Sequence, residues 1–355
     1  MYSAGRNPIQ LSRENMRKVE EMTPDEITEL TGILQYWQGI PTLLRCPYRP
    51  DMSDTDVGLI GFPYCGGNHI ERMQYLAPRA VRHRSSSYHR HVRGFPFDPF
   101  SVLRVSDLGD VPLPHVFNPD MSTDDAENFY RKVHERGIMP ITIGGDHSVT
   151  TPILRAIGGK RSRYGGPIGM IHFDCHADTA AEFGGTRHNA GAAFRIGVEE
   201  ELFDPARTVQ IGFHGPQIDP TLDNWSRERF TVITLQDILD NGLERTASDI
   251  LRVVGSGPTY LSFDLDVLDP AYAPAVADPE INGMTTRELF ILLNKLKGVD
   301  LVGADIVCFC PPLDNPSQIT AMTISELMLQ FVAMMAFHRN QGNEVTPARS
   351  MTTAT

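Results

Sequence analysis

The stretch Ile168-Gly169-Met170-Ile171-His172-Phe173-Asp174-Cys175-His176-Ala177-Asp178 joins a mostly apolar run to a cluster of acidic and imidazole side chains. A short apolar run of this kind is typical of a strand that is buried on both faces of a parallel sheet. Polar residues that follow such a strand lie at the carboxyl edge of the sheet, where open α/β proteins bind their ligands. This stretch therefore predicts a buried parallel strand with a ligand site at its end.

Two further segments have the same organisation. The run 139–143 precedes Gly144-Gly145-Asp146-His147-Ser148, and the run 259–263 precedes Asp264-Leu265-Asp266. Each segment alone is compatible with an ordinary turn, but the three together predict one site made of His147, Asp174, His176, Asp178, Asp264 and Asp266. Four carboxylates packed together would resist ionisation, and a pair of divalent cations resolves that conflict. Two histidines among oxygen ligands suit Mn²⁺, Fe²⁺, Ni²⁺ or Co²⁺ better than a thiolate-type zinc site.

Composition narrows the class of protein. The 355 residues carry a formal charge of −12, which argues against non-specific binding to nucleic acid. Five scattered cysteines form no disulfide framework, and the polar N-terminus does not have the pattern of a signal peptide. The longest apolar stretch, Leu327 to Phe337, is too short to span a bilayer. We therefore expect a cytoplasmic protein that binds neither nucleic acid nor a membrane.

Strand and helix signals alternate along most of the chain. Strands are expected near 56–63, 102–105, 139–143, 168–173, 208–212, 230–234, 259–263 and 301–306, and helices near 124–136, 149–157, 189–195, 236–241, 244–254, 285–297 and 323–338. This alternation predicts an α/β fold with three αβα layers and a central, mostly parallel sheet. We expect an N-terminal arm and helix over 1–38, one catalytic domain over 39–340, and a tail over 341–355.

The motifs at 144–148, 172–178 and 262–270 resemble those of the ureohydrolase (arginase and agmatinase) superfamily, and the resemblance covers roughly residues 40–340. Three further strings are similar to the agmatinase branch in particular: Gly39-Ile40-Pro41-Thr42, Asp98-Pro99-Phe100 and Gly109-Asp110-Val111-Pro112. The resemblance implies an arginase-like fold and a hydrolase that cleaves a carbon–nitrogen bond in a linear amidine. It also implies two metal ions per subunit, with Mn²⁺ as the family default and Ni²⁺ as the main alternative. Homo- or hetero-oligomers, as trimers or hexamers, are expected on the same ground.

The resemblance also assigns roles to individual residues. The first metal ion would be held by His147, Asp174, Asp178 and Asp264, and the second by Asp174, His176, Asp264 and Asp266. Two metal ions that share Asp174 and Asp264 as ligands lower the pKa of a water molecule bound between them, which supplies hydroxide at neutral pH. Asp178 would accept a hydrogen bond from that hydroxide and pass its proton on. His188 resembles the family's loop histidine, although the surrounding Arg187-His188-Asn189 departs from the usual His-Gly-Thr pattern.

Departures from the family concern the substrate. Cys308 stands where guanidino hydrolases usually have a glutamate that holds the guanidinium, and a neutral thiol cannot replace those charged hydrogen bonds. Asp278, in Ala275-Val276-Ala277-Asp278-Pro279-Glu280, replaces a threonine-rich string, and Met73 and Tyr75 replace a string that contains glycine and arginine. We therefore expect Cys308, Asp278, Met73 and Tyr75 to line a less polar pocket. A biguanide such as metformin is our hypothesis for the substrate, with dimethylamine and guanylurea as the products of a metformin hydrolase subunit.

Other readings stay open. An agmatinase, guanidinobutyrase or guanidine hydrolase would release urea from the same kind of site. The replacement at Cys308 is also compatible with a weakly active structural subunit that supports a paralogue in a mixed oligomer. A deacetylase similar to histone deacetylases is disfavoured, because those enzymes use one zinc ion and lack the Gly-Gly-Asp-His-Ser motif.

Overall fold

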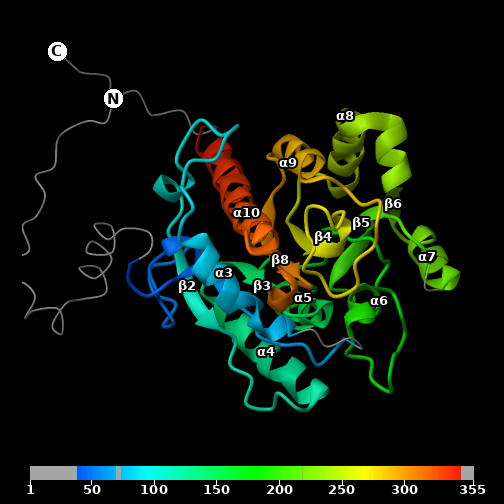
Figure 1. Cartoon of the computed structure of the whole chain (residues 1–355), viewed down its shortest axis with the longest axis horizontal. Helices are drawn as coiled ribbons and strands as arrows, with labels where there is room; N and C mark the ends of the chain where they lie inside the picture. The colour runs from blue at the N-terminus through cyan, green and yellow to red at the C-terminus, as the bar shows by residue number, and fades with distance from the viewer. Residues whose placement is uncertain (1–37, 69–72, 218, 345–355) are drawn as a thin grey trace, which may run out of the picture.

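Eight apolar runs form a single sheet in which every hydrogen-bonded pair of strands is parallel (Figure 1). The computed structural model describes residues 38–68, 73–217 and 219–344. Residues 1–37 of the arm and helix expected over 1–38, and residues 345–355 of the tail expected over 341–355, therefore lie outside it. The strands follow the order β2-β1-β3-β8-β7-β4-β5-β6. Their bounds are β1 Val57–Gly61, β2 Val105–Asp110, β3 Met139–Ile143, β4 Ile168–Phe173, β5 Phe203–Phe213, β6 Thr231–Thr234, β7 Thr259–Asp264 and β8 Leu301–Val307.

Helices cover both faces of this sheet, which confirms the predicted three-layer class. Neighbouring residues of one strand alternate between two apolar cores, as Met170 and Ile171 of β4 do. The first core packs the sheet against α3 (Ala77–Ser85), α8 (Leu235–Val254), α9 (Thr286–Lys295) and α10 (Ile319–Glu344). The second core packs the other face against α4 (Pro119–Glu135), α5 (Thr150–Ile157) and α6 (Ala193–Glu199), while α7 (Pro220–Arg227) lies beside β6. Because apolar side chains fill both faces, the four central strands β3, β8, β7 and β4 are buried along nearly their whole length.

The start of helix α4 differs from the sequence expectation for a local reason. Helix α4 begins at Pro119 rather than near 124, because Asn118 caps it by accepting a hydrogen bond from the Met121 amide at 3.1 Å. The helices expected at 236–241 and 244–254 are present as the two parts of α8, which meet at a kink at the non-helical Gly242. A capping box between Thr234 and Asp237 fixes its start.

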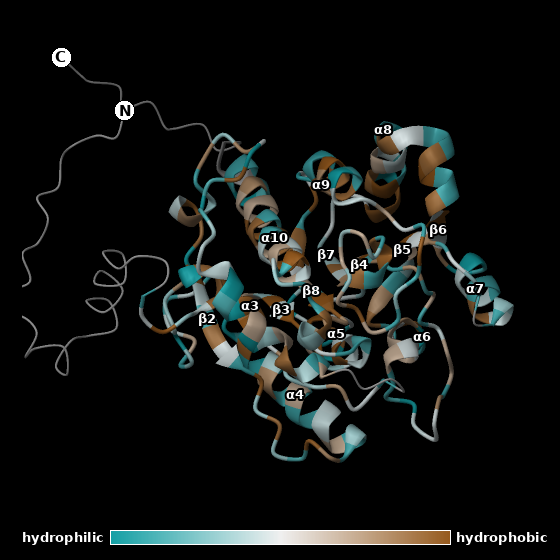
Figure 2. Cartoon of the chain, in the orientation of Figure 1, coloured by the Kyte–Doolittle hydropathy of each residue, from teal (hydrophilic) through white to brown (hydrophobic). Residues whose placement is uncertain are grey.

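The apolar stretch Leu327–Phe337 belongs to a helix that is longer than the sequence indicated. By length and composition alone, Ile319–Gln341 of α10 could cross a membrane, but 83% of its most apolar window is buried inside the protein. The apolar residues of α10 pack together with those of the strands in the first core. Figure 2 shows apolar residues on α10 and on the strands beside it. This burial identifies α10 as a core helix of the fold.

The four central strands, β3, β8, β7 and β4, lie side by side and end at the same edge of the sheet. The turn after β3 approaches the neighbouring backbone so closely that only glycine fits at position 145. A Cβ atom there would lie 1.4 Å from the carbonyl oxygen of Tyr64. The Gly145 carbonyl also accepts a hydrogen bond from the Cys308 amide at 2.7 Å, which ties the end of β3 to the end of β8. The Gly-Gly pair therefore sets the position of the following His147.

Replacing Gly145 by alanine should force this turn apart and destabilise the protein by about 3 kcal/mol or more, because the clash involves backbone atoms that cannot rotate away. Gly166→Ala is the matched control, since a Cβ atom at Gly166 would meet nothing within 4 Å. The control should stay within about 0.5 kcal/mol of the parent protein. Urea denaturation of both variants measures the difference, and equal midpoints would contradict the close approach.

Candidate metal centre

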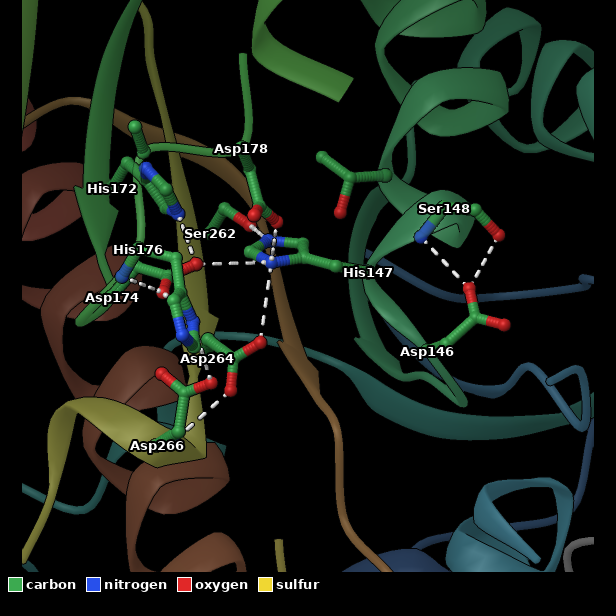
Figure 3. Close-up of polar contacts among 12 residues, drawn as sticks. Asp146, His147, Ser148, His172, Asp174, His176, Asp178, Ser262, Asp264 and Asp266 are labelled. Atoms are coloured by element: carbon green, nitrogen blue, oxygen red, sulfur yellow. Dashed lines mark hydrogen bonds and ion pairs between the residues drawn. The ribbon is translucent and has the colours of Figure 1, made fainter. Parts of the chain in front are cut away.

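His147 lies at the centre of a group of three carboxylates, two from the loop after β4 and one from the end of β7 (Figure 3). It opens the short turn of helix η5 (His147–Val149) directly after β3. Its Nδ1 atom lies 3.2 Å from Asp174 Oδ2, 2.9 Å from Asp178 Oδ2 and 3.2 Å from Asp264 Oδ2. Asp174 follows β4 and Asp264 ends β7, so the parallel sheet brings these residues together at its carboxyl edge.

A second group lies beside the first and shares Asp174 with it. His176 Nδ1 is 3.5 Å from Asp174 Oδ1 and 3.2 Å from Asp266 Oδ2. Asp174 thus presents one oxygen to each histidine, and the Asp266 amide donates to Asp264 Oδ1 at 3.0 Å. All six side chains expected from the sequence lie together. They form two groups, one around His147 and one around His176.

The tautomer of His147 favours a cation over a proton at this point. Its Nε2 atom donates a hydrogen bond to Ser262 Oγ at 2.9 Å, because the Ser262 hydroxyl proton is itself donated to Asp305 Oδ1 at 2.7 Å. Asp305 also accepts from the hydroxyls of Thr150 at 2.9 Å and Tyr260 at 2.8 Å. In the neutral ring Nδ1 therefore carries a lone pair, and the three carboxylate oxygens around it cannot donate a hydrogen bond to that lone pair. A lone pair aimed between three carboxylate oxygens fits a divalent ion.

Three of the four carboxylates, all except Asp174, hold protons more tightly than usual when no cation compensates them. Burial, followed by the charges of Asp266 and Asp174, raises the pKa of Asp264 to about 8. Burial, followed by the charge of Asp174, raises the pKa values of Asp178 and Asp266 to about 6. Two divalent cations would remove this repulsion, so the electrostatics of the site match the donor atoms.

A cavity of about 550 Å³ opens over these two groups. That volume suits a small organic ligand. Its outer wall is acidic, and Arg227 is the only lysine or arginine among the described residues that line it. The acidic residues of that wall, apart from the six above, are Asp219, Asp223, Asp278 and Glu280.

Two of the four residues expected to line the pocket do so. Cys308 and Asp278 are brought together by an antiparallel bridge between Val276 and Phe309, in which the Ala277 amide donates to the Cys308 carbonyl at 3.1 Å. Burial, the charges of Asp264 and Asp266, and a hydrogen bond to Asp264 keep the pKa of the Cys308 thiol well above its usual range. The thiol is therefore neutral at the position where the family has a charged glutamate.

The expectation was wrong for Met73 and Tyr75 in the described part of the cavity. Both side chains are exposed, and neither lines the cavity, because residue 73 begins a separate turn that leads into α3. His188 was also expected in the site, but it does not line the described part of the cavity. Its Nδ1 lies 2.7 Å from Asp120 Oδ1 and its Nε2 lies 3.3 Å from the Arg155 guanidinium. Ala190 and Gly191 occupy the cavity wall instead.

Three further residues, His172, Cys175 and His214, lie near the two groups of ligands. His172 stacks on Phe194 with ring centroids 3.7 Å apart, and its Nε2 lies 2.8 Å from Asp174 Oδ2, so it orients that carboxylate as a buried support. The Cys175 thiol can join Asp174, His176 and Asp266 in a four-residue metal cluster. His214, which lines the cavity after β5, was not among the residues predicted from the sequence. The rule used for the other strands, a polar residue directly after a buried run, would have found it.

Comparisons with known proteins agree with this geometry. The sequence profile of the arginase family matches residues 55–334. Guanidinopropionase of Pseudomonas aeruginosa is 43% identical over 300 residues, which cover 84% of this chain and 92% of the relative. The structure of proclavaminate amidinohydrolase from Streptomyces clavuligerus has a TM-score of 0.81 at 32% identity and covers 86% of this chain and 100% of that one. A formiminoglutamase variant from Trypanosoma cruzi, solved with Mn²⁺, has a TM-score of 0.70 at 25% identity and covers 80% and 94% of the two chains.

Metal binding should strengthen as the pH rises from 6 to 8. The folded, metal-free site holds more protons than the unfolded chain in this range, because the pKa values of Asp264, Asp178 and Asp266 are raised. The site alone therefore loses stability as the pH rises, and a metal ion must displace these protons. Each displaced proton gives about a tenfold gain in affinity per pH unit. Thermal unfolding with and without Mn²⁺ at several pH values measures this, and a pH-independent gain would contradict it.

Ser262→Ala should weaken metal binding by about 10- to 100-fold, because the hydroxyl holds the His147 ring in its metal-binding tautomer. Ser325→Ala is the control, since Ser325 is also buried but donates to the Ala321 carbonyl within α10. Calorimetric titration of Mn²⁺ into both metal-free variants separates the two. Equal affinities in the two variants would show that the contact to Ser262 does not orient the ligand.

Proposed function

The chain belongs to the arginase family, and we propose that it uses two divalent metal ions to hydrolyse a cationic guanidine-type substrate that has no carboxylate. Membership confirms the resemblance found in the sequence and identifies the chain as a hydrolase of carbon–nitrogen bonds in guanidino or amidino compounds. The charge of the substrate is the finer part of the proposal. The observation that supports this part of the proposal is the acidic wall of the cavity.

The two groups around His147 and His176 would hold the metal ions. His147, Asp174, Asp178 and Asp264 would bind one ion, and Asp174, His176, Asp264 and Asp266 the other. Such a pair supplies Lewis acidity and makes hydroxide available at neutral pH. Mn²⁺ is our first choice because the related formiminoglutamase was solved with it, whereas nothing among these relatives supports Ni²⁺.

The protein side chains bind and orient the substrate and move protons. Asp178 lines the cavity and uses Oδ2 toward His147, so we assign its second oxygen to accept the proton of the attacking water. Asp278 follows Ala277, the residue that bonds to the carbonyl of the neutral Cys308, and both Asp278 and Cys308 line the cavity. We assign to Asp278 the charged hydrogen bond that the substituted position 308 no longer provides.

The acidic wall favours a substrate with positive charge at both ends. Asp219, Asp223, Asp278 and Glu280 face one arginine, Arg227, in the described lining. A carboxylate tail would be repelled there, whereas an ammonium group would be attracted. An aminoalkyl guanidine such as agmatine meets both requirements, and its hydrolysis would consume one water and release urea and a diamine.

Metformin is the second candidate, because part of the same cavity is apolar and uncharged. Phe183, Leu222, Ala190 and the neutral Cys308 line it together with the acidic residues. These groups could accept an N,N-dimethyl end without losing hydrogen bonds. Metformin hydrolysis would consume one water and give dimethylamine and guanylurea.

A substrate panel on the Mn²⁺-loaded chain, purified alone, tests the proposal. We expect kcat/KM for agmatine or metformin to exceed that for guanidinopropionate and guanidinobutyrate by about tenfold or more, because a carboxylate is repelled by the acidic wall. Free guanidine, Ni²⁺-loaded protein and chelated protein complete the panel. A preference for the guanidino acids would overturn the substrate assignment. A full metal complement without any turnover would favour the structural subunit of a mixed oligomer.

Within that panel, Asp278→Asn should lower kcat/KM for the preferred cation by about 10- to 100-fold, the value of one charged hydrogen bond. Glu228→Gln removes the same charge from the end of α7, outside the lining of the cavity, and should change kcat/KM by less than about twofold. Unchanged kinetics in Asp278→Asn would place the recognition of the cation elsewhere.

A further inference from the structure

Cys175 stands between two metal ligands in the sequence and lies against one of them in space. Its Sγ atom is 3.3 Å from Nδ1 of His176 and 3.6 Å from Nε2 of the same ring. Its amide donates a hydrogen bond to Asp266 Oδ1 at 3.3 Å, and the residue is buried in the wall of the cavity. By position, the thiol therefore belongs to the group around His176.

Three donor atoms surround Nδ1 of His176 at similar distances. Asp266 Oδ2 lies at 3.2 Å, Cys175 Sγ at 3.3 Å and Asp174 Oδ1 at 3.5 Å. The four residues each offer one ligand atom, and these atoms lie within 4.8 Å of one another. Metal–ligand bonds are about 2.0–2.3 Å long, so neighbouring ligands of one ion are about 3–3.5 Å apart. The contacts around Nδ1 thus have the spacing of one coordination shell that includes the sulfur.

Hydrogen bonds hold the backbone on both sides of Cys175. The His176 amide donates to Asp174 Oδ1 at 2.6 Å, and the Ala177 carbonyl accepts from Gln210 Nε2 at 2.8 Å. The amide of Cys175 itself is bonded to Asp266. Because the segment is already fixed against two of the ligands, the sulfur needs only its own side-chain torsion to reach an ion.

The two halves of the centre differ in their donor atoms. The contacts of His147 Nδ1 are to oxygens of Asp174, Asp178 and Asp264. The group around His176 adds a sulfur to nitrogen and oxygen. Oxygen ligands suit Mn²⁺, whereas a thiolate favours softer ions such as Zn²⁺. This difference bears on which ion each half holds.

We infer that Cys175 is a further ligand of the His176 group and that its sulfur makes this half of the centre select a thiophilic divalent ion, Zn²⁺ or Co²⁺, over Mn²⁺. The inference rests on the two ligand groups assigned in the proposed function. The thiol gives its proton to solvent as the metal–sulfur bond forms. With Mn²⁺ the thiol stays protonated, and the ion is held by the nitrogen and oxygen ligands alone.

Titration of Co²⁺ into the metal-free protein tests whether the sulfur binds. We expect a sulfur-to-cobalt charge-transfer band in the near ultraviolet, which is absent from Cys175→Ser and Cys175→Ala. Cys46→Ser is the matched control and should keep the band, because Cys46 is also buried but does not line the cavity. A parent protein that holds two Co²⁺ ions per chain without this band would overturn the inference. So would a band that persists in Cys175→Ala and disappears in Cys308→Ala.

Calorimetric titration of Zn²⁺ and Mn²⁺ tests the selectivity. Nitrogen and oxygen sites already prefer Zn²⁺ to Mn²⁺, so the informative quantity is the part of that preference that depends on Cys175. In Cys175→Ser, the Kd for Zn²⁺ should rise by about tenfold or more, whereas the Kd for Mn²⁺ should stay within about threefold. Equal losses for both ions would assign the thiol a structural role and overturn the inference.

The same measurements separate this inference from the proposed function. If the parent protein binds none of these ions, the ligand groups fail and both proposals fall. If it binds two ions and hydrolyses a compound of the panel without a sulfur band, the proposed function stands and only the role of Cys175 is refuted. The spectrum of the parent protein decides this point even if a variant at position 175 does not fold.

Discussion

Mutual repulsion among four buried carboxylates is the constraint on which the rest of this structure depends. Asp174, Asp178, Asp264 and Asp266 lie at one sheet edge, and burial together with their own charges raises the pKa values of three of them. Such a cluster persists only if the scaffold holds it rigidly and if cations compensate the charge. The scaffold here is a set of central parallel strands, packed between two apolar cores, whose carboxyl ends cannot separate without breaking the sheet.

Hydrogen bonds from neighbouring residues hold the metal-binding side chains in place on this rigid scaffold. The chain of hydrogen bonds from His147 through Ser262 to Asp305 is satisfied at every step, because Asp305 accepts from three hydroxyls. Asp146 serves the neighbouring turn by accepting from the amides of Gly67 and Ser148, which joins the loop after β1 to the loop after β3. Backbone strain is found in the same place, since Asp178 and Cys308 have φ values of +49° and +68°. Non-glycine residues keep such conformations only where the surroundings determine them, as they do here.

Patterns local to a strand end were predictable from sequence, and contacts between distant segments were not. The runs before Asp174 and Asp264 specified buried parallel strands, and parallel strands necessarily bring their ends to one edge, so the six-residue cluster followed. His188 failed because its partner, Asp120, belongs to a helix 68 residues earlier in the chain, and nothing in the local loop indicates that contact. Met73 and Tyr75 were expected at the cavity but are exposed, because they lie in a separate turn that leads into α3. His214 was different: the strand rule applied to it, but no familiar motif drew attention to the residue.

One β-bridge places the neutral Cys308 and the charged Asp278 near each other in the wall of the cavity, where they bear on the choice of substrate. Val276 and Phe309 pair in antiparallel fashion, so Cys308 and Asp278 lie on adjoining segments of the cavity wall. The neutral Cys308 thiol is buried and the Asp278 carboxylate is partly exposed, so the negative charge of this wall lies nearer to solvent than position 308 does. A guanidinium that follows this charge would bind farther from position 308, and the space left beside Cys308 would be apolar. A neutral buried residue and a partly exposed carboxylate on adjoining segments fit the substituted, cationic guanidine that we propose as the substrate.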